Sequence, residues 1–306
     1  MPSANSKHES PIALIAALLA NLGIAAAKFI AAFLTGSSAM LAEGIHSLVD
    51  TSNEGVLIIG VRRARRPPDD LHQFGHGKEI YFWTLVVAVL LFAIGGGLAI
   101  YEGLSHFVDP HPIDNILASY AVLAISFALE AASSVIALRE LEPAGAASVW
   151  RALLETKDAS ILAVLVENFA AMIGLVMAFF GLLATELTGD PRFDALGSLA
   201  VGLVLTSVAV FLAAESRALL IGESATGPLV ERARRTMESD GAVAAVESLR
   251  TMHLGPDHVV MTVRVRFAPD RQDIPAVIAR LKKRLVEGDP LLDDVTIEPV
   301  PATAAE

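Results

Sequence analysis

Residues 38–61 read SAMLAEGIHSLVDTSNEGVLIIGV, a segment as long as a membrane-spanning helix that nevertheless carries ionisable side chains. A helix that crosses the hydrocarbon core of a bilayer needs about 20 mostly apolar residues. The alternative, a large buried core of a soluble protein, would leave too little polar surface to cover so many apolar segments. The sequence therefore predicts an α-helical membrane protein with six transmembrane helices. The other five segments with this length and character are 11–33, 80–100, 116–138, 160–183 and 193–214.

The composition of the 306-residue chain agrees with a membrane protein. Hydrophobic residues make up 54 % and charged residues 19 %, whereas soluble domains average about 45–50 % and about 25 %. A formal net charge of −11 at pH 7 argues against a nucleic-acid partner. Because the chain has no cysteine, any metal must be held by His, Asp, Glu, Asn or backbone oxygen.

The composition changes after Gly222, which divides the chain into a membrane domain, residues 1–222, and a soluble domain, residues 223–306. Apolar periodicity in the soluble domain predicts a helix–strand–strand–helix–strand order. This order predicts a cytoplasmic α/β domain with a ferredoxin-like fold, small enough to gain stability by pairing with a second copy. The predicted elements are the helices 229–238 and 274–286 and the strands 245–254, 259–267 and 295–297.

Lysine and arginine gather in alternate loops. The loop after the second segment carries arginines at positions 62, 63, 65 and 66, and the loop after the fourth carries Arg139, Arg151 and Lys157. Since positively charged loops face the cytoplasm, both termini are predicted to be cytoplasmic, and we expect a bacterial plasma membrane. The polar residues 1–11 precede a segment of full membrane length and lack a cleavage pattern, so they are interpreted as a tail rather than a signal peptide.

Four polar side chains share one face of the second predicted helix, namely Glu43, His46, Asp50 and Asn53. An ionisable residue at membrane depth costs at least a few kcal/mol, so by default it marks function. An imidazole and a carboxylate one turn apart can both bind one divalent cation. The alternative is a structural stripe that forms hydrogen bonds between helices. We favour metal ligands, because the face combines four such residues with a His–carboxylate pair.

Two ligands do not complete a metal site, and the fifth segment offers Glu167 and Asn168 near its middle. Glu167 is the better candidate for a third ligand, whereas Asn168 fits a ligand and a structural amide equally well. Lys28, Glu102 and Glu130 also lie within predicted helices, and we interpret them as structural. Each of the two carboxylates could line a polar interior, take part in a proton path or pair with Lys28, and the sequence does not show which of them pairs.

The loop that follows the second segment offers a second group of metal-binding side chains. It reads PPDDLHQFGHGKE over residues 67–79 and places Asp69, His72 and His76 at spacings of three and four. Gly75 and Gly77 let the backbone bend around them. A polar loop with two histidines is more often only a loop, so a second metal site and an ordinary loop remain open here.

Taken together, these motifs resemble those of the cation diffusion facilitators. The resemblance rests on six spans, HSLVD at 46–50, the loop at 67–79 and the ferredoxin-like tail, and it covers essentially the whole chain. The segments SLVDTSNE, RRARRPPDD, YFWTLVVAV, YEGL and LLIGESA are similar to the branch of mitochondrial zinc exporters and their bacterial relatives. The resemblance implies a homodimeric transporter that exchanges Zn²⁺ or a related divalent cation for protons.

The resemblance also implies which residues bind metal. The transport ligands fall on His46, Asp50 and Glu167, but the fourth position falls on Ala163, which cannot bind a metal. Asn53, Asn168 or water would then complete the shell, and an oxygen-rich shell suits Mn²⁺ or Fe²⁺ better than a two-histidine site would. The ligands of the loop site fall on Asp69, His72 and His76.

The soluble domain departs further from the family pattern. The positions that bind structural zinc in some members fall on Glu247, Val263, Glu298 and Val300, and valine cannot ligate. This site is therefore expected to be lost. His253 and His258 flank the turn between the two long strands, and we interpret both as surface residues.

The hypothesis from the sequence is a transporter that exports a divalent metal, with Zn²⁺ favoured, by proton-coupled alternating access. His46 would carry a proton, since imidazole is the side chain whose unperturbed protonation changes closest to neutral pH. Alternatives are a metal-responsive membrane scaffold or sensor that does not transport, and a transporter selective for Mn²⁺, Fe²⁺ or Co²⁺. No HExxH motif occurs, so an enzyme is not expected. The expected partners are the metal ion, protons, the lipid bilayer and a second copy of the chain, with no resident cofactor.

Overall fold

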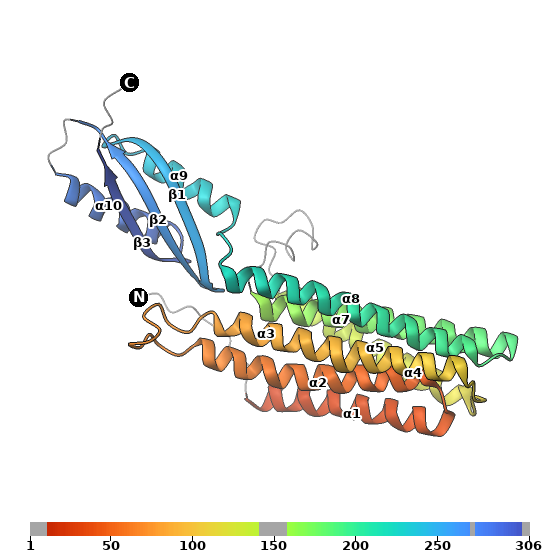
Figure 1. Ribbon diagram of the computed structural model, residues 1–306. Coiled ribbons are helices and arrows are strands. Elements are labelled where there is room, and N and C mark those ends of the chain that lie inside the picture. The colour runs from red at the N-terminus through yellow and green to blue at the C-terminus, as the bar shows by residue number, and fades with distance from the viewer. Residues whose placement is uncertain (1–10, 141–157, 270–272, 302–306) are drawn as a thin grey trace. The chain divides into compact units, whose positions relative to one another are not determined.

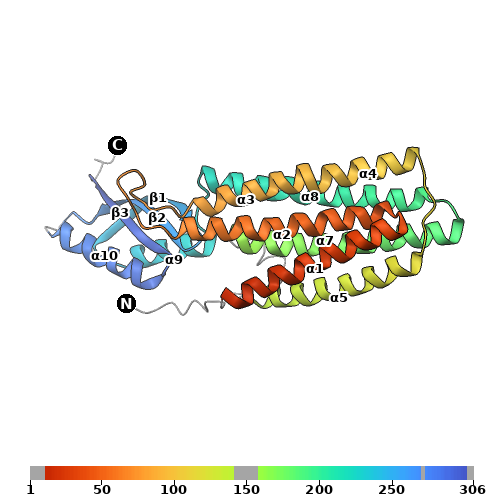
Figure 2. The same ribbon diagram turned by 90° about the horizontal axis from the view of Figure 1, so that it is seen from below.

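The computed structural model describes residues 11–140, 158–269 and 273–301, which fall into two compact units (Figure 1). The larger unit is a bundle of long helices that run side by side in two perpendicular views (Figure 2). The smaller unit combines the C-terminal domain with the segment Gly60–Phe82, which holds the predicted loop site. The domain boundary at Gly222 stays a prediction. The helices before that boundary are α1 Pro11–Thr35, α2 Ser38–Ala64, α3 Glu79–Leu90, the π-helix η1 Leu91–Gly96, α4 Gly97–Val108, α5 Ile116–Glu140, α7 Ala159–Thr188 and α8 Arg192–Ile221.

Each predicted membrane segment is helical, within bounds that extend the prediction by up to eight residues at one end. Four described helices are long and apolar enough to cross a membrane: Glu79–Val108, Ile116–Val135, Ala159–Thr188 and Arg192–Ile221. The described apolar part of α1 is the shorter helix Asn21–Thr35. In α2 the polar stripe lowers the hydropathy. Six spans therefore remain a prediction, while a membrane domain with four clear apolar helices is established.

Glycines set the packing of the third membrane segment against α8. A Cβ at Gly96 would overlap the side chain of Thr206, and one at Gly202 would lie 2.7 Å from Ile100 Cγ1. Small residues let membrane helices approach closely, which gains van der Waals contact where no hydrophobic driving force exists. Gly95 and Gly96 therefore permit the close packing of this segment on α8.

The C-terminal domain has the predicted order of elements. The strand order is β1-β2-β3, with β1 antiparallel and β3 parallel to β2. Both helices pack on one face of this sheet around a buried apolar core that includes Leu229, Val263 and Leu281. A small α/β domain is thus established, and its ferredoxin-like classification stays a proposal. The elements are α9 Gly227–Glu238, β1 Val243–Gly255, β2 His258–Phe267, α10 Ile274–Gly288 and β3 Leu292–Val300.

Glu247 and Glu298 of this domain form ion pairs with arginines of β2. Glu247 lies 3.2 Å from the Nε of Arg266, and Glu298 lies 3.5 Å from the Nε of Arg264. The surface interpretation of His253 is wrong, because this side chain is buried, with Nδ1 3.3 Å from the carbonyl oxygen of Gly255. The strand register shifts between His253 and Gly255, which turns the imidazole inward against the expected alternation.

Candidate metal sites

The His46–Asp50 pair on α2 lies inside the helical bundle. Nδ1 of His46 lies 3.3 Å from Oδ1 of Asp50, and the imidazole is 1 % exposed. Neither ring nitrogen has a hydrogen-bond partner among the described residues. A buried polar atom without a partner is rare because its desolvation is not compensated. A ring nitrogen without a hydrogen-bond partner next to a carboxylate can bind a cation.

The structure brings Glu167 of α7 opposite the same face of α2. The side-chain amide of Asn53 donates a hydrogen bond to Glu167 Oε1 at 2.8 Å, and both residues are buried. Asn53 therefore orients the predicted third ligand. Asn168 takes another direction, since its amide donates to Ser133 Oγ of α5 at 3.4 Å. Ala163 is fully buried and contributes only packing, as its side chain requires.

A cavity in the bundle is lined by Asp50 and Glu167, one residue from each of these two pairs. Its polar wall contains four carboxylates, two of which, Glu54 and Glu130, were not predicted as parts of the site. Glu54 also accepts a hydrogen bond from the Asn21 amide at 2.6 Å. The spacing of Glu54, one turn after Asp50, is the signal that could have found it. The polar residues of the wall are Asn21, Ser47, Asp50, Glu54, Glu130, Ser133, Glu167 and Asn168.

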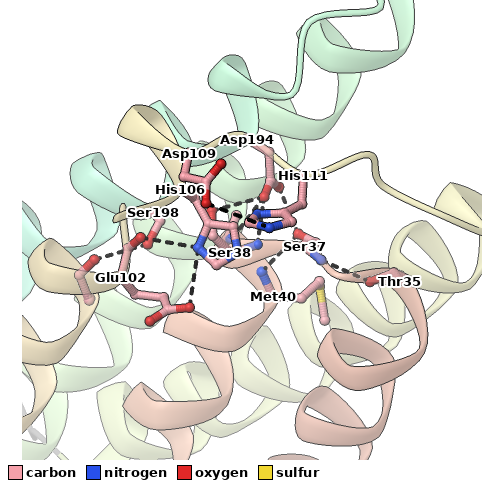
Figure 3. A network of polar contacts seen from close by, with 12 residues as sticks. Thr35, Ser37, Ser38, Met40, Glu102, His106, Asp109, His111, Asp194 and Ser198 are labelled. Atoms are coloured by element: carbon pink, nitrogen blue, oxygen red, sulfur yellow. Dashed lines mark hydrogen bonds and ion pairs between the residues drawn. The ribbon is translucent and has the colours of Figure 1, made fainter. Parts of the chain in front are cut away.

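Lys28 and Glu102, two charged residues of the predicted membrane helices, form contacts that the sequence did not predict. Of the roles left open for Glu102 and Glu130, pairing with Lys28 is not found, because the Lys28 ammonium contacts Glu43 at 3.0 Å. Glu102 instead lies 3.2 Å from His106 Nδ1 (Figure 3).

Sequence reasoning also missed Asp194 at the start of α8. Its carboxylate accepts hydrogen bonds from the Ser37 hydroxyl and the Ser38 backbone, both at 2.6 Å, and so caps the start of α2 (Figure 3).

The loop between α2 and α3 holds the second predicted group. Asp69 lies 3.1 Å from His72 Nδ1 and 3.0 Å from His76 Nε2, so one carboxylate bridges two imidazoles. Among the described residues, this is the group of three His, Asp or Glu whose ligand atoms all lie within 4.8 Å of one another. His46, Asp50 and Glu167 do not meet that criterion together in this conformation.

Local backbone geometry shapes this loop. The His72 backbone N–H donates to Asp69 Oδ1 at 2.6 Å, and this bond chiefly lowers the pKa of the Asp69 carboxyl to about 2. Gly75 adopts a positive φ of 82°, as its predicted role in bending the chain requires. Gly77 serves a different purpose, because a Cβ there would overlap the carbonyl oxygen of Leu254. The loop thus packs closely on the turn between β1 and β2.

Comparison with known proteins identifies the family of this chain. The profile of the cation efflux transmembrane domain matches residues 14–221, two-thirds of the chain. The chain belongs to the cation efflux family. This membership confirms the resemblance to the cation diffusion facilitators and makes the chain an integral membrane protein. Its family is one of transporters rather than enzymes.

Three relatives of this cation efflux protein show the range of the family. The mitochondrial proton-coupled zinc antiporter SLC30A9 of Xenopus laevis is 34 % identical over 267 residues, covering 84 % of this chain and 48 % of the relative. Metal tolerance protein C4 of Arabidopsis thaliana is 31 % identical over 270 residues, covering 86 % and 58 %. The magnetosome protein MamB of Paramagnetospirillum magneticum is 24 % identical over 282 residues, covering 91 % and 90 %. The chain thus spans about half the length of the SLC30A9 relative.

Proposed function

We propose that this cation efflux protein exports a divalent metal, with Zn²⁺ favoured, in exchange for protons, and that the ion passes through the cavity lined by α1, α2, α5 and α7. The observation that carries this proposal is the buried His46, whose two ring nitrogens have no hydrogen-bond partner among the described residues while Asp50 lies 3.3 Å away. The SLC30A9 relatives are named proton-coupled zinc antiporters, which supports zinc and protons as substrates.

Each residue has a distinct part in this proposal. His46 and Asp50 bind the incoming ion, and Glu167 closes on it from α7 while Asn53 holds its carboxylate in place. Because the ligands must be deprotonated to bind metal, protons that reach them compete with the ion and promote its release. Glu54 and Glu130 extend the negative wall of the cavity and attract cations into it.

The loop residues Asp69, His72 and His76 form a second metal site in this proposal. Their donors already converge, and Asp69 and His72 are exposed to solvent, so an ion can bind without rearrangement of the helices. We assign this site a regulatory role rather than a place on the transport path, because Asp69 and His72 are more than half exposed.

The remaining parts of the proposal concern the assembly. We propose six spans with both termini cytoplasmic in a bacterial plasma membrane, a membrane domain 1–222, and a ferredoxin-like domain 223–306 that pairs with a second copy. The arginines that end α2 support this orientation by the positive-inside rule. The helix–strand–strand–helix–strand order supports the ferredoxin-like classification.

A second candidate function has one observation in its favour. Ala163 occupies the family's fourth ligand position, and its side chain is fully buried. A three-ligand site fits a transporter that prefers Mn²⁺, Fe²⁺ or Co²⁺, or a metal-responsive scaffold or sensor that no longer transports. Uptake of Zn²⁺, Mn²⁺, Fe²⁺ and Co²⁺ compared in one liposome preparation separates these alternatives.

The experiment that tests the proposal measures metal-driven proton flux in proteoliposomes. Asp50→Ala should lower zinc flux by about 100-fold or more, since even an outer-shell partner of a metal ligand contributes about 10–100-fold. The matched control is Ser52→Ala on the same helix, whose exposed hydroxyl bonds only the Leu48 carbonyl oxygen. If Asp50→Ala transports as well as the control, the assignment of the transport site is wrong.

A further inference from the structure

The Lys28 ammonium is buried inside the helical bundle and contacts the helix that carries the proposed transport ligands. Its Nζ donates to Glu43 Oε2 at 3.0 Å and to Ser47 Oγ at 2.7 Å. The side chains of Lys28 and Glu43 are both 0 % exposed. A charge taken out of water in this way requires an opposite charge in direct contact. Lys28 therefore attaches α1 to α2 at two residues, Glu43 and Ser47, that lie before and after His46 in the sequence.

Only one of the two Glu43 oxygens is used by this ion pair. Oε1 has no hydrogen-bond partner among the described residues. It points toward α7, because a Cβ at Gly174 would lie 2.5 Å from it. Glu43 thus reaches into the space between α2 and α7, the helices that carry the proposed ligands His46, Asp50 and Glu167.

The order of residues along α2 gives this carboxylate a direction. Glu43, His46 and Asp50 follow one another on one face, and Glu43 lies nearest the start of the helix. The other end of α2 leads to the arginine-rich loop that we place in the cytoplasm. An exported ion that leaves His46 and Asp50 toward the start of α2 therefore meets Glu43 next.

We propose that Glu43 is a transient ligand for the departing metal and that Lys28 is a built-in cation that competes with the metal for it. This inference rests on the proposed transport function and deepens it. Lys28 occupies Glu43 when no metal is there, so the carboxylate does not add a permanent ligand to the site. The ammonium keeps the affinity for metal low enough for release, and its return to Glu43 displaces the ion.

The test compares three variants of the full-length chain by zinc binding in detergent and by zinc transport in proteoliposomes. Lys28→Met removes the competing cation and leaves Glu43 free to bind. The double variant Lys28→Met/Glu43→Gln removes both charges while nearly keeping the shape of the pair, and such a replacement of a buried ion pair is commonly tolerated by the fold. Asp50→Ala reports on the transport site itself.

Competition predicts opposite changes in affinity and rate. Lys28→Met should bind zinc about ten-fold more tightly and transport it more slowly, a coupling typical of two linked sites. The double variant should lose this gain in affinity and still transport about ten-fold more slowly than wild type, because Glu43 no longer receives the departing ion. A merely structural ion pair would not tighten zinc binding in any variant.

Two results overturn the proposal. If the double variant transports zinc at the wild-type rate, Glu43 takes no part in release, and this result needs no data from Lys28→Met should that variant fail to fold. If Lys28→Met folds and binds zinc no more tightly than the double variant, the ammonium does not compete with the metal. When Asp50→Ala loses transport in the same assay, either result rejects the role of Lys28 and Glu43 while the proposed transport site stands. When Asp50→Ala transports zinc as wild type does, the proposed transport site fails, and when wild type itself transports no zinc, the proposed function fails.

Discussion

The buried cluster on α2 and α7 and the exposed cluster in the loop before α3 use the same donors, imidazole and carboxylate, in opposite settings. In the loop, Asp69 already contacts both histidines at 3.0–3.1 Å, and more than half of its side chain is exposed. In the bundle, His46 is 1 % exposed, and its nitrogens have no hydrogen-bond partner among the described residues. The donor atoms of the loop group converge in this structure, whereas those of the proposed buried site do not.

This difference indicates a division of roles. A preformed, solvent-exposed group binds an ion without changing the fold, which suits sensing of metal concentration. A buried group that needs a movement of α7 toward α2 binds an ion only together with a conformational change, which suits transport. Four carboxylates line the cavity. Two of them accept hydrogen bonds, Glu54 from Asn21 and Glu167 from Asn53.

The largest effect is expected when equivalent histidines are removed from the two clusters. His46→Ala should lower zinc transport in proteoliposomes by about 100-fold or more, because a buried first ligand contributes more than an outer-shell partner. His76→Ala should lower it by no more than about five-fold, as expected for a site that is only coupled to transport. Equal losses in the two variants would contradict the division of roles.

A smaller effect is expected from the two asparagines near Glu167. Asn53→Ala removes the hydrogen bond that orients Glu167 and should weaken zinc binding by about ten-fold, as for other residues that position a metal ligand. Asn168→Ala is the matched control, because its amide bonds Ser133 rather than Glu167. A larger loss in the Asn168 variant, measured by calorimetry, would show that Asn168 rather than Asn53 completes the shell.

The pH dependence of the loop site gives the third comparison. The lowered pKa of Asp69, about 2, keeps this carboxylate charged at any pH well above that value. The charged Asp69 carboxylate therefore contributes to metal binding at any pH above the ordinary pKa of a carboxyl group. This contribution is lost only as the pH falls toward about 2. Asp69→Asn should therefore weaken loop binding by the same factor at pH 5.5 and pH 7, measured calorimetrically in the Asp50→Ala background. Asp70→Asn is the control, and a factor that changes between the two pH values would contradict the prediction.

The smallest effect is expected in the C-terminal domain. Glu298 pairs with Arg264 at 3.5 Å, and its former partner position is the fully buried Val263. Glu298→Ala should therefore leave the number of zinc ions bound per chain unchanged, as counted by mass spectrometry of the intact protein. Loss of one ion would show that this domain holds a structural metal.

The sequence predicted the helices well because membrane length and apolarity are local properties of a segment. It placed their ends less well, since α8 continues to Ile221, seven residues beyond the apolar segment. Polar residues such as Ser216 and Arg217 extend a helix without extending its apolar run. The predictions for Arg151, Lys157 and the N-terminal tail lie outside the described residues.

The candidate sites also differ in whether local sequence spacing was enough to predict them. Asp69, His72 and His76 were predictable because their spacing within one loop brings them together. The Lys28–Glu43 pair was not, because its geometry depends on how α1 and α2 are rotated against each other. Asp194 likewise acts across 156 residues of sequence on Ser38, and a lone aspartate at the start of a helix gives no sign of its partner.

The most direct test of the central claim is the position of zinc in an experimental structure of the protein, determined from anomalous scattering at the zinc edge. We predict a zinc peak between α2 and α7, within about 2.0–2.2 Å of a His46 nitrogen and an Asp50 oxygen, with Glu167 moved into contact. This peak should persist when Asp69, His72 and His76 are replaced together by alanine. A structure in which zinc binds only at the loop, and disappears with those replacements, would contradict the proposal that the metal passes through the buried cluster.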